Sequence, residues 1–220
     1  MKADIEALNL SSRKEFYKNI ASQYPPNVCS YSLNCNIGNP LSTLASIPDF
    51  AHKNNIRLYL HIPPVHAWFT EAIHAQGIGD FYNLWIGELV KINEAVAARN
   101  KREPFPLWDF GGYNALTMEK LPIPGSKEKM QNYYEGSHCL PTAGNAVMNR
   151  MFDHGEQSPA FGRLLTSGTL ARHFEEQKLQ RDFFLSRPGL AVGKQDFLHS
   201  IDGLVIKRRH KCSASDKEGS

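Results

Sequence analysis

Residues 56–64 read Ile-Arg-Leu-Tyr-Leu-His-Ile-Pro-Pro, and this segment is the clearest strand pattern in the chain. It is mainly apolar and ends at two prolines, which cannot donate to a sheet ladder, so it predicts a strand that ends near Ile62. Before it, residues 41–51 place apolar side chains at helical spacing, and Lys53-Asn54-Asn55 closes that helix. A helix that leads into a buried strand is half of a parallel α/β unit.

The same alternation continues along the chain. Residues 104–110 predict a second short strand, and Gly111-Gly112 turns away from it. Apolar side chains at helical spacing predict further helices from Val65, from Phe81 to about Arg99, through Ala146 to Phe152, and from Leu164 to about Phe184. We expect Pro141 or Thr142 to cap the third of these helices. We interpret the three tryptophans, Trp68, Trp85 and Trp108, as core residues.

The fold class that follows is α/β, with a three-layer parallel sheet and helices on both faces. The sequence marks two good strands and a weaker third near Val28, whereas such sheets have about five. We therefore expect an incomplete α/β domain over residues 41–186. Residues 1–40 form an N-terminal helical or irregular segment in this interpretation, and 187–220 form a polar, basic and largely disordered tail.

Composition excludes several classes of function. The formal net charge is only +3, and part of it lies in the C-terminal basic run, so we expect no nucleic-acid partner. Four cysteines without a C-x-x-C pair indicate neither a metal site nor a disulfide framework, and no cofactor is expected. The charged N-terminus lacks the apolar core of a signal peptide, and no apolar run approaches the length of a membrane span. As written, the chain is expected to be cytoplasmic.

The candidate chemistry lies in residues 133–144, Tyr-Tyr-Glu-Gly-Ser-His-Cys-Leu-Pro-Thr-Ala-Gly. Glu135 precedes His138 by three residues, and the segment leads directly into a helix. A carboxylate can fix the tautomer of a neighbouring imidazole, so that the other ring nitrogen accepts a proton from a serine hydroxyl. The alternative is that Glu135 is a solvated turn residue and His138 braces the following helix.

From about Leu41 to Phe184, the order of motifs resembles the C-terminal half of an SGNH-type (GDSL-like) hydrolase domain. It is most similar to bacterial SGNH-like proteins related to the teichoic-acid D-alanylation and alginate O-acetylation families. Three segments carry the resemblance: residues 58–67, residues 107–114, and Glu135-x-x-His138 followed by Pro141 and Gly144. The resemblance implies an SGNH or flavodoxin-like sheet, with His138 as general base and Glu135 in place of the family's aspartate.

The other candidate residues lie at the predicted carboxyl ends of strands, where open α/β sheets bind their ligands. We interpret His66, Asp109 and Asn114 as candidates for substrate binding. Asp109 could instead cap the turn that follows it, and His66 could cap a helix. The family's nucleophile lies in a Gly-x-Ser block after the first strand, and residues 1–40 contain no such block: Ser30 and Ser32 follow no glycine.

Two hypotheses follow. The first is an esterase or acyltransferase acting on an O-acylated carbohydrate or cell-envelope polymer through a covalent acyl-enzyme, as in full-length relatives that are envelope-associated. The second is a non-catalytic partial domain that acts as a binding module or is an inactive remnant. An incomplete sheet would also leave an unpaired edge through which the chain could self-associate.

Overall fold

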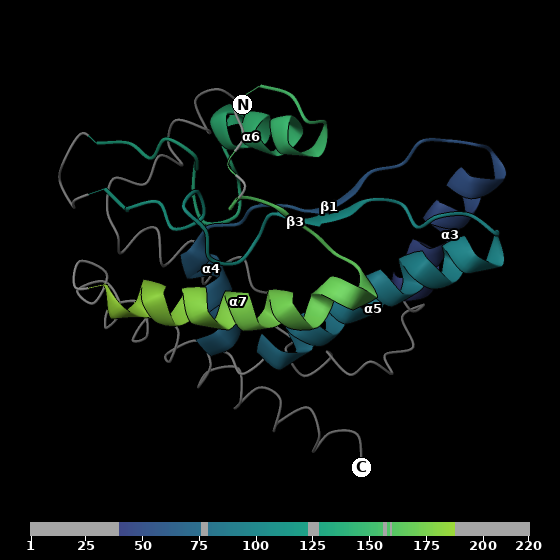
Figure 1. Cartoon of the computed structure of the whole chain (residues 1–220). Helices are drawn as coiled ribbons and strands as arrows, with labels where there is room; N and C mark the ends of the chain where they lie inside the picture. The colour runs from purple at the N-terminus through teal and green to yellow at the C-terminus, as the bar shows by residue number, and fades with distance from the viewer. Residues whose placement is uncertain (1–39, 76–78, 123–127, 156–157, 159, 188–220) are drawn as a thin grey trace, which may run out of the picture.

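A computed structural model describes residues 40–75, 79–122, 128–155, 158 and 160–187, and Figure 1 shows the arrangement of the elements. The predicted strand near Val28, the N-terminal segment and the C-terminal tail lie outside the described residues. The elements follow in the order α3 (Pro40–Lys53), β1 (Leu60–Ile62), α4 (Ala67–Ala75), α5 (Gly79–Arg99), β2 (Leu107–Asp109), α6 (Pro141–Met151), β3 (Arg163–Leu164) and α7 (Ser167–Ser186).

The fold is mixed α/β. In the described residues β1 and β2 pair in parallel, with Leu60 opposite Leu107 and Ile62 opposite Asp109. Strand β3 pairs with β2 in the antiparallel direction, so the order is β1-β2-β3 and the sheet is mixed rather than wholly parallel. Sequence patterns missed β3 because two residues are too short to show an alternation. Strand β1 is also shorter than the predicted 56–62.

Side chains of the sheet alternate between two apolar clusters. Ile62 and Leu107 pack with Ile86 and Val90 of α5, and Leu170 and Phe174 of α7 join the same cluster. On the other side, Phe110 and Trp108 pack with Val147 and Met151 of α6. Figure 1 shows the corresponding arrangement, with α6 on one side of the strands and α4, α5 and α7 on the other.

A third apolar cluster lies beneath the loops that follow the strands. It joins Ala67, Trp68 and Ala72 of α4 to Phe184 of α7, together with loop residues Tyr113, Leu121, Met130 and Tyr133. Trp68 is buried here, as the sequence predicted, and its ring meets Phe184 edge-on at 5.2 Å between centroids. This cluster holds the loops that carry the candidate site.

Two glycines permit close packing at the end of β2. Gly112 has φ +70°, and a Cβ there would lie 1.7 Å from Oε1 of Gln177 on α7. Gly162 has φ +78°, and a Cβ there would enter the ring of Phe110. Both positions require glycine for conformation and for space.

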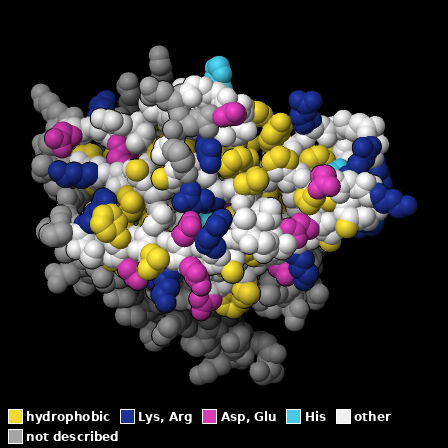
Figure 2. All heavy atoms as spheres, in the orientation of Figure 1, with side chains coloured by type: hydrophobic (Ala, Val, Ile, Leu, Met, Phe, Trp, Pro, Cys, Tyr) yellow, Lys and Arg dark blue, Asp and Glu magenta, His cyan; other side chains and the backbone are white. Residues whose placement is uncertain are grey.

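Some large apolar side chains stay exposed. Leu84 and Trp85 of α5 are 59% and 40% exposed, so the prediction that Trp85 is a core residue is wrong. On the other side of the sheet, Phe152 after α6 is exposed and its ring lies 4.8 Å from that of Tyr59. Figure 2 shows hydrophobic side chains gathered on the visible face between α6 and α3.

Candidate functional site

The Glu135 to His138 turn folds around the carboxylate of Glu135. Its Oε1 accepts the backbone N–H of His138 at 2.9 Å, and its Oε2 accepts the backbone N–H of Ser137 at 2.9 Å. The Ser137 hydroxyl also donates to Oε1 at 3.0 Å. An acidic side chain that binds the amides two and three residues ahead closes a turn, as aspartate does in Asx turns.

The same carboxylate contacts the imidazole of His138, through Oε1 and Nδ1. The pair therefore has the geometry in which Nδ1–H donates to the acid and Nε2 is left as a proton acceptor. The side chain of Glu135 is 1% exposed, whereas that of His138 is 73% exposed. The carboxylate of Glu135 is thus fixed inside the protein, while the imidazole of His138 faces solvent.

The neighbouring backbone holds this turn in place. Tyr133 and Cys139 form an antiparallel bridge across it, and the amide of Tyr134 donates to the carbonyl of His138 at 2.9 Å. The carbonyl of Gly136 accepts the amide of His66 at 2.9 Å, which ties the turn to the loop after β1. The first and third segments of the predicted site therefore meet.

His66 caps α4. Its Nδ1 accepts the amide of Trp68 at 3.2 Å, and its Nε2 lies 2.9 Å from the carbonyl of Glu119, so the neutral ring carries its proton on Nε2. Complete burial lowers the pKa of His66 to about 4. The ring is thus neutral near pH 7, and it occupies the capping role that the sequence left open.

Asp109 ends β2 and points toward α7 rather than toward His138. Its Oδ1 accepts the amide of Gly111 at 2.8 Å, and its Oδ2 lies 2.9 Å from Nε2 of His173. Both side chains of this pair are nearly fully buried, with Asp109 3% exposed and His173 4% exposed. Asp109 thus caps the following turn, and it also joins the sheet to α7.

Asn114 braces the loop after β2. Its Oδ1 accepts the amides of Leu116 and Thr117 at 3.0 Å, and its amide nitrogen donates to the carbonyl of Phe110 at 3.2 Å. The carbonyl of Thr117 in turn accepts the amide of Ala67 at 2.8 Å. Thr117 therefore links Asn114 of the second segment to Ala67 of the first. Substrate contact by His66, Asp109 and Asn114 stays a prediction, and all three side chains are buried.

Sequence reasoning missed the partners that α7 supplies to this edge. His173 pairs with Asp109, Gln177 accepts the amide of Tyr113 at 2.9 Å, and Arg181 binds Glu71 of α4. Arg181 makes two bonds to that carboxylate, at 2.7 and 3.0 Å, and the Tyr113 hydroxyl donates to it as well. The sequence shows only that residues 173, 177 and 181 are four apart and share one helix face, and it does not indicate their partners.

The buried carboxylate of Glu71 changes the ionisation of its partners. Its hydrogen bonds raise the pKa of Arg181, and burial, with the nearby Glu71 charge, raises the pKa of Tyr113 above its ordinary value. Both shifts keep Arg181 charged and Tyr113 protonated. The three groups therefore form a fixed tie between α4, α7 and the loop after β2.

The described part of the chain contains neither a metal-binding cluster nor a membrane-spanning helix. No group of three or more His, Cys, Asp or Glu side chains there is arranged to hold a metal ion. The helices within those ranges also include none that combines the length and the apolar character needed to cross a bilayer.

Comparison with known proteins identifies no relative. No protein-family model matches the chain, and neither the curated proteins nor the solved structures include a significant match. The function must therefore be argued from the site itself.

Proposed function

We propose that this chain is the C-terminal part of an SGNH-type α/β domain, and that His138 and Glu135 are the base and acid of an ester-hydrolysing or acyl-transferring site. The substrate class is an O-acylated carbohydrate or cell-envelope polymer, as the motif resemblance implies. The observation that carries the proposal is the contact between His138 Nδ1 and the buried carboxylate of Glu135, with the imidazole exposed.

The chemistry would proceed by acyl transfer to serine. Nε2 of His138 takes the proton of a serine hydroxyl while that oxygen attacks the ester carbonyl, and the protonated imidazole then returns the proton to the departing alcohol. Water releases the acyl group from serine in a hydrolase, and a second hydroxyl accepts it in a transferase. Glu135 holds the ring and stabilises the imidazolium that forms.

The site's position is consistent with this proposal. The turn is bonded to the loop after β1, and that loop is bonded to the loop after β2, so the three matched segments gather beyond the carboxyl ends of the parallel pair. Open α/β sheets bind their ligands at this edge. The buried residues His66, Asp109 and Asn114 fit a supporting role in it.

A non-catalytic partial domain is the second candidate. One observation favours it: within the described residues, the hydrogen bonds of the His138 side chain all involve Nδ1, and Nε2 has no serine hydroxyl beside it. In that case the edge of the sheet acts as a binding surface, or the site is an inactive remnant.

Hydrolysis of p-nitrophenyl acetate distinguishes the two. We expect His138→Ala to lower the rate by about a hundredfold or more, since a general base contributes on that order. His154→Ala is the matched control, because His154 is also exposed but lies beyond α6. Equal rates for the native chain and His138→Ala would remove His138 from the mechanism.

A fluorophosphonate probe tests for the nucleophile directly. The catalytic proposal requires covalent labelling of one serine in the folded chain, reduced in His138→Ala and unchanged in His154→Ala. Mass spectrometry of the labelled peptide would identify that serine. Absence of labelling in a folded sample would favour the non-catalytic candidate.

A further inference from the structure

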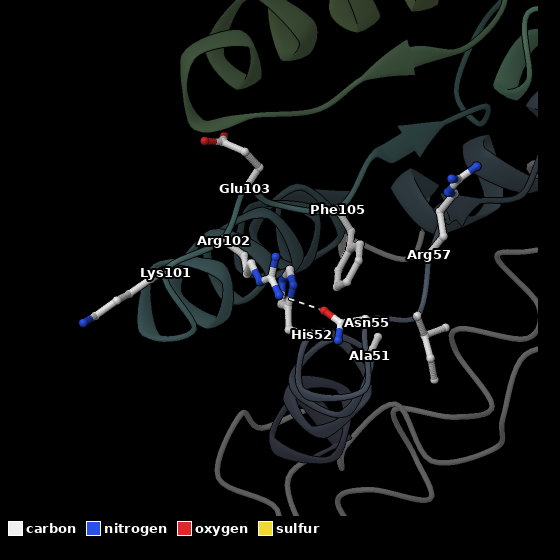
Figure 3. A pocket seen from close by; sticks show the side chains of 9 residues that line it. Ala51, His52, Asn55, Arg57, Lys101, Arg102, Glu103 and Phe105 are labelled. Carbon is white, nitrogen blue, oxygen red and sulfur yellow. Dashed lines mark hydrogen bonds between the residues drawn. The ribbon is translucent and has the colours of Figure 1, made fainter.

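A pocket lies at the edge of the sheet opposite to that of His138. It has a volume of about 600 Å³ and is formed where α3 leads into β1 and α5 leads into β2 (Figure 3). It is therefore at the amino ends of the parallel strands. Its lining comprises Ala51, His52, Asn55, Ile56, Arg57, Lys101, Arg102, Glu103 and Phe105.

The pocket is built on two helix ends of the same form. Asn55 after α3 and Lys101 after α5 have positive φ angles, of 54° and 53°. In each case the next backbone amide donates a hydrogen bond to a carbonyl in the last turn of the helix: Ile56 N–H to the carbonyl of Ala51, and Arg102 N–H to the carbonyl of Ala97. These are Schellman ends, which satisfy the last carbonyls of each helix. The Arg102 guanidinium also donates to Oδ1 of Asn55 at 2.7 Å, which joins the two ends.

Positive charge exceeds negative charge in the lining. The lining contains three cationic side chains, Arg57, Lys101 and Arg102, and one carboxylate, that of Glu103, which leaves an excess of two positive charges. Cations near helix C-termini also stabilise the helix dipole. That role is already filled by Lys53 and Arg99, which pair with Asp49 at 2.6 and 2.9 Å.

The pocket cations differ from that pair. Among the described residues, the side chains of Arg57 and Lys101 have neither a hydrogen bond nor an ion pair. In Figure 3 they extend to opposite sides of the pocket, with Arg102, Asn55 and His52 between them. Long side chains on the rim can turn toward a ligand that enters the centre.

His52 and Phe105 supply an aromatic surface to the pocket. Their rings stack at 4.0 Å between centroids with an interplanar angle of 19°. His52 is 9% exposed, and its Nε2 is buried with no hydrogen-bond partner among the residues that the structure describes. An unpartnered buried nitrogen is costly, and a ligand oxygen would satisfy it. Ile56, which is 45% exposed, adds an apolar surface to the lining.

We propose that this pocket binds a small organic phosphate. The excess of two positive charges is larger than the roughly −1 that the two helix C-termini contribute together, so the pocket attracts an anion. Arginine guanidinium groups bind phosphate oxygens in a bidentate manner. The volume lies in the range of pockets for small organic ligands and exceeds what inorganic phosphate needs, so the organic part would lie against Ile56 and Phe105. The site is independent of the chemistry proposed for His138.

Backbone amide NMR titrations at constant ionic strength test this site, with phenyl phosphate and inorganic phosphate as probes. Phenyl phosphate should give saturable shifts at residues 55–57 and 101–103, and it should bind at least about fivefold more tightly than inorganic phosphate. Equal affinity for the two probes would overturn the organic part of the proposal. Absence of saturable shifts would overturn the site.

A pair of variants with matched charge separates a built site from general attraction. Arg57→Gln with Lys101→Gln should weaken binding of phenyl phosphate by about tenfold or more. Lys120→Gln with Lys178→Gln removes the same charge from exposed positions elsewhere and should change affinity by less than about twofold. Equal weakening in both double variants would overturn the proposal.

Discussion

At the scale of single residues, burial divides the five candidates. His66, Asp109, Asn114 and Glu135 are all less than 9% exposed, and His138 alone faces solvent. Each buried member accepts or donates hydrogen bonds inside the protein, and these bonds fix a loop or a helix start. The candidate site is thus one accessible imidazole on a rigid polar support.

The buried imidazole of His66 predicts a pH dependence of stability. Its pKa of about 4 in the folded protein lies below the ordinary value of 6.5, so the unfolded chain binds the proton more readily. The contribution of neutral His66 to the free energy of unfolding is fully present above about pH 6.5. As the pH falls toward 4, this contribution decreases by on the order of 3 kcal/mol.

Urea unfolding of the native chain and of His66→Asn at pH 7 and pH 5 measures this contribution. Asparagine keeps a capping oxygen for α4 but does not titrate. We expect the free energy of unfolding to fall more steeply in the native chain than in the variant. Parallel losses in the two proteins would show that His66 does not carry the effect.

At the scale of elements, sequence patterns located the long helices well. The predicted helix from Phe81 to about Arg99 is α5 (Gly79–Arg99). The helix predicted to follow a cap at Pro141 or Thr142 is α6 (Pro141–Met151), but its N-cap is Leu140 and Pro141 is its first residue. These helices carry an apolar face or a proline at the start, which are local signals. Strands β1 and β2 were predicted in the correct order but are only three residues each.

Helix α7 shows why the polar contacts that support the candidate site could not be predicted from the sequence. Its inward face carries His173, Gln177 and Arg181, so polar residues occupy positions where a periodicity argument expects apolar ones. Their partners, Asp109, Tyr113 and Glu71, are distant in sequence. Only the tertiary fold pairs them, and for that reason the sequence identified Asp109 without its histidine.

The loop after β2, which packs against α7 at Gly112, gives a prediction at this scale. Gly112→Ala places a methyl group against Gln177 at positive φ, and we expect it to destabilise the fold by about 1–3 kcal/mol. Gly144→Ala in α6 meets no atom within 4 Å and should stabilise the protein by about 0.5–1 kcal/mol. Thermal unfolding of both variants measures the two changes. Equal midpoints for them would contradict this account of the close approach at Gly112.

At the scale of the whole molecule, the described sheet has β1 at one end of its order, paired with β2. The side of the molecule near β1 also exposes apolar surface, where Phe152 contacts Tyr59. Unpaired edges and exposed apolar patches favour association. These features motivate the expectation of self-association.

Sedimentation velocity over a concentration series tests that expectation. We expect the native chain to associate as its concentration rises and Phe152→Lys to reduce the association. Leu179→Lys is the control, because Leu179 is 69% exposed on α7. A monomer at all concentrations, with a two-state melt, would reject the self-association hypothesis.

The local construction of the Glu135 to His138 turn has a kinetic consequence. The acid and the base are three residues apart and are joined by bonds within one turn, so bringing them together closes a very short loop at little entropic cost. Under the proposed function, the base His138 is therefore preassembled before any distant segment docks. A nucleophile that arrives from another part of a domain would meet an imidazole already oriented, and its own positioning would dominate the entropy of activation.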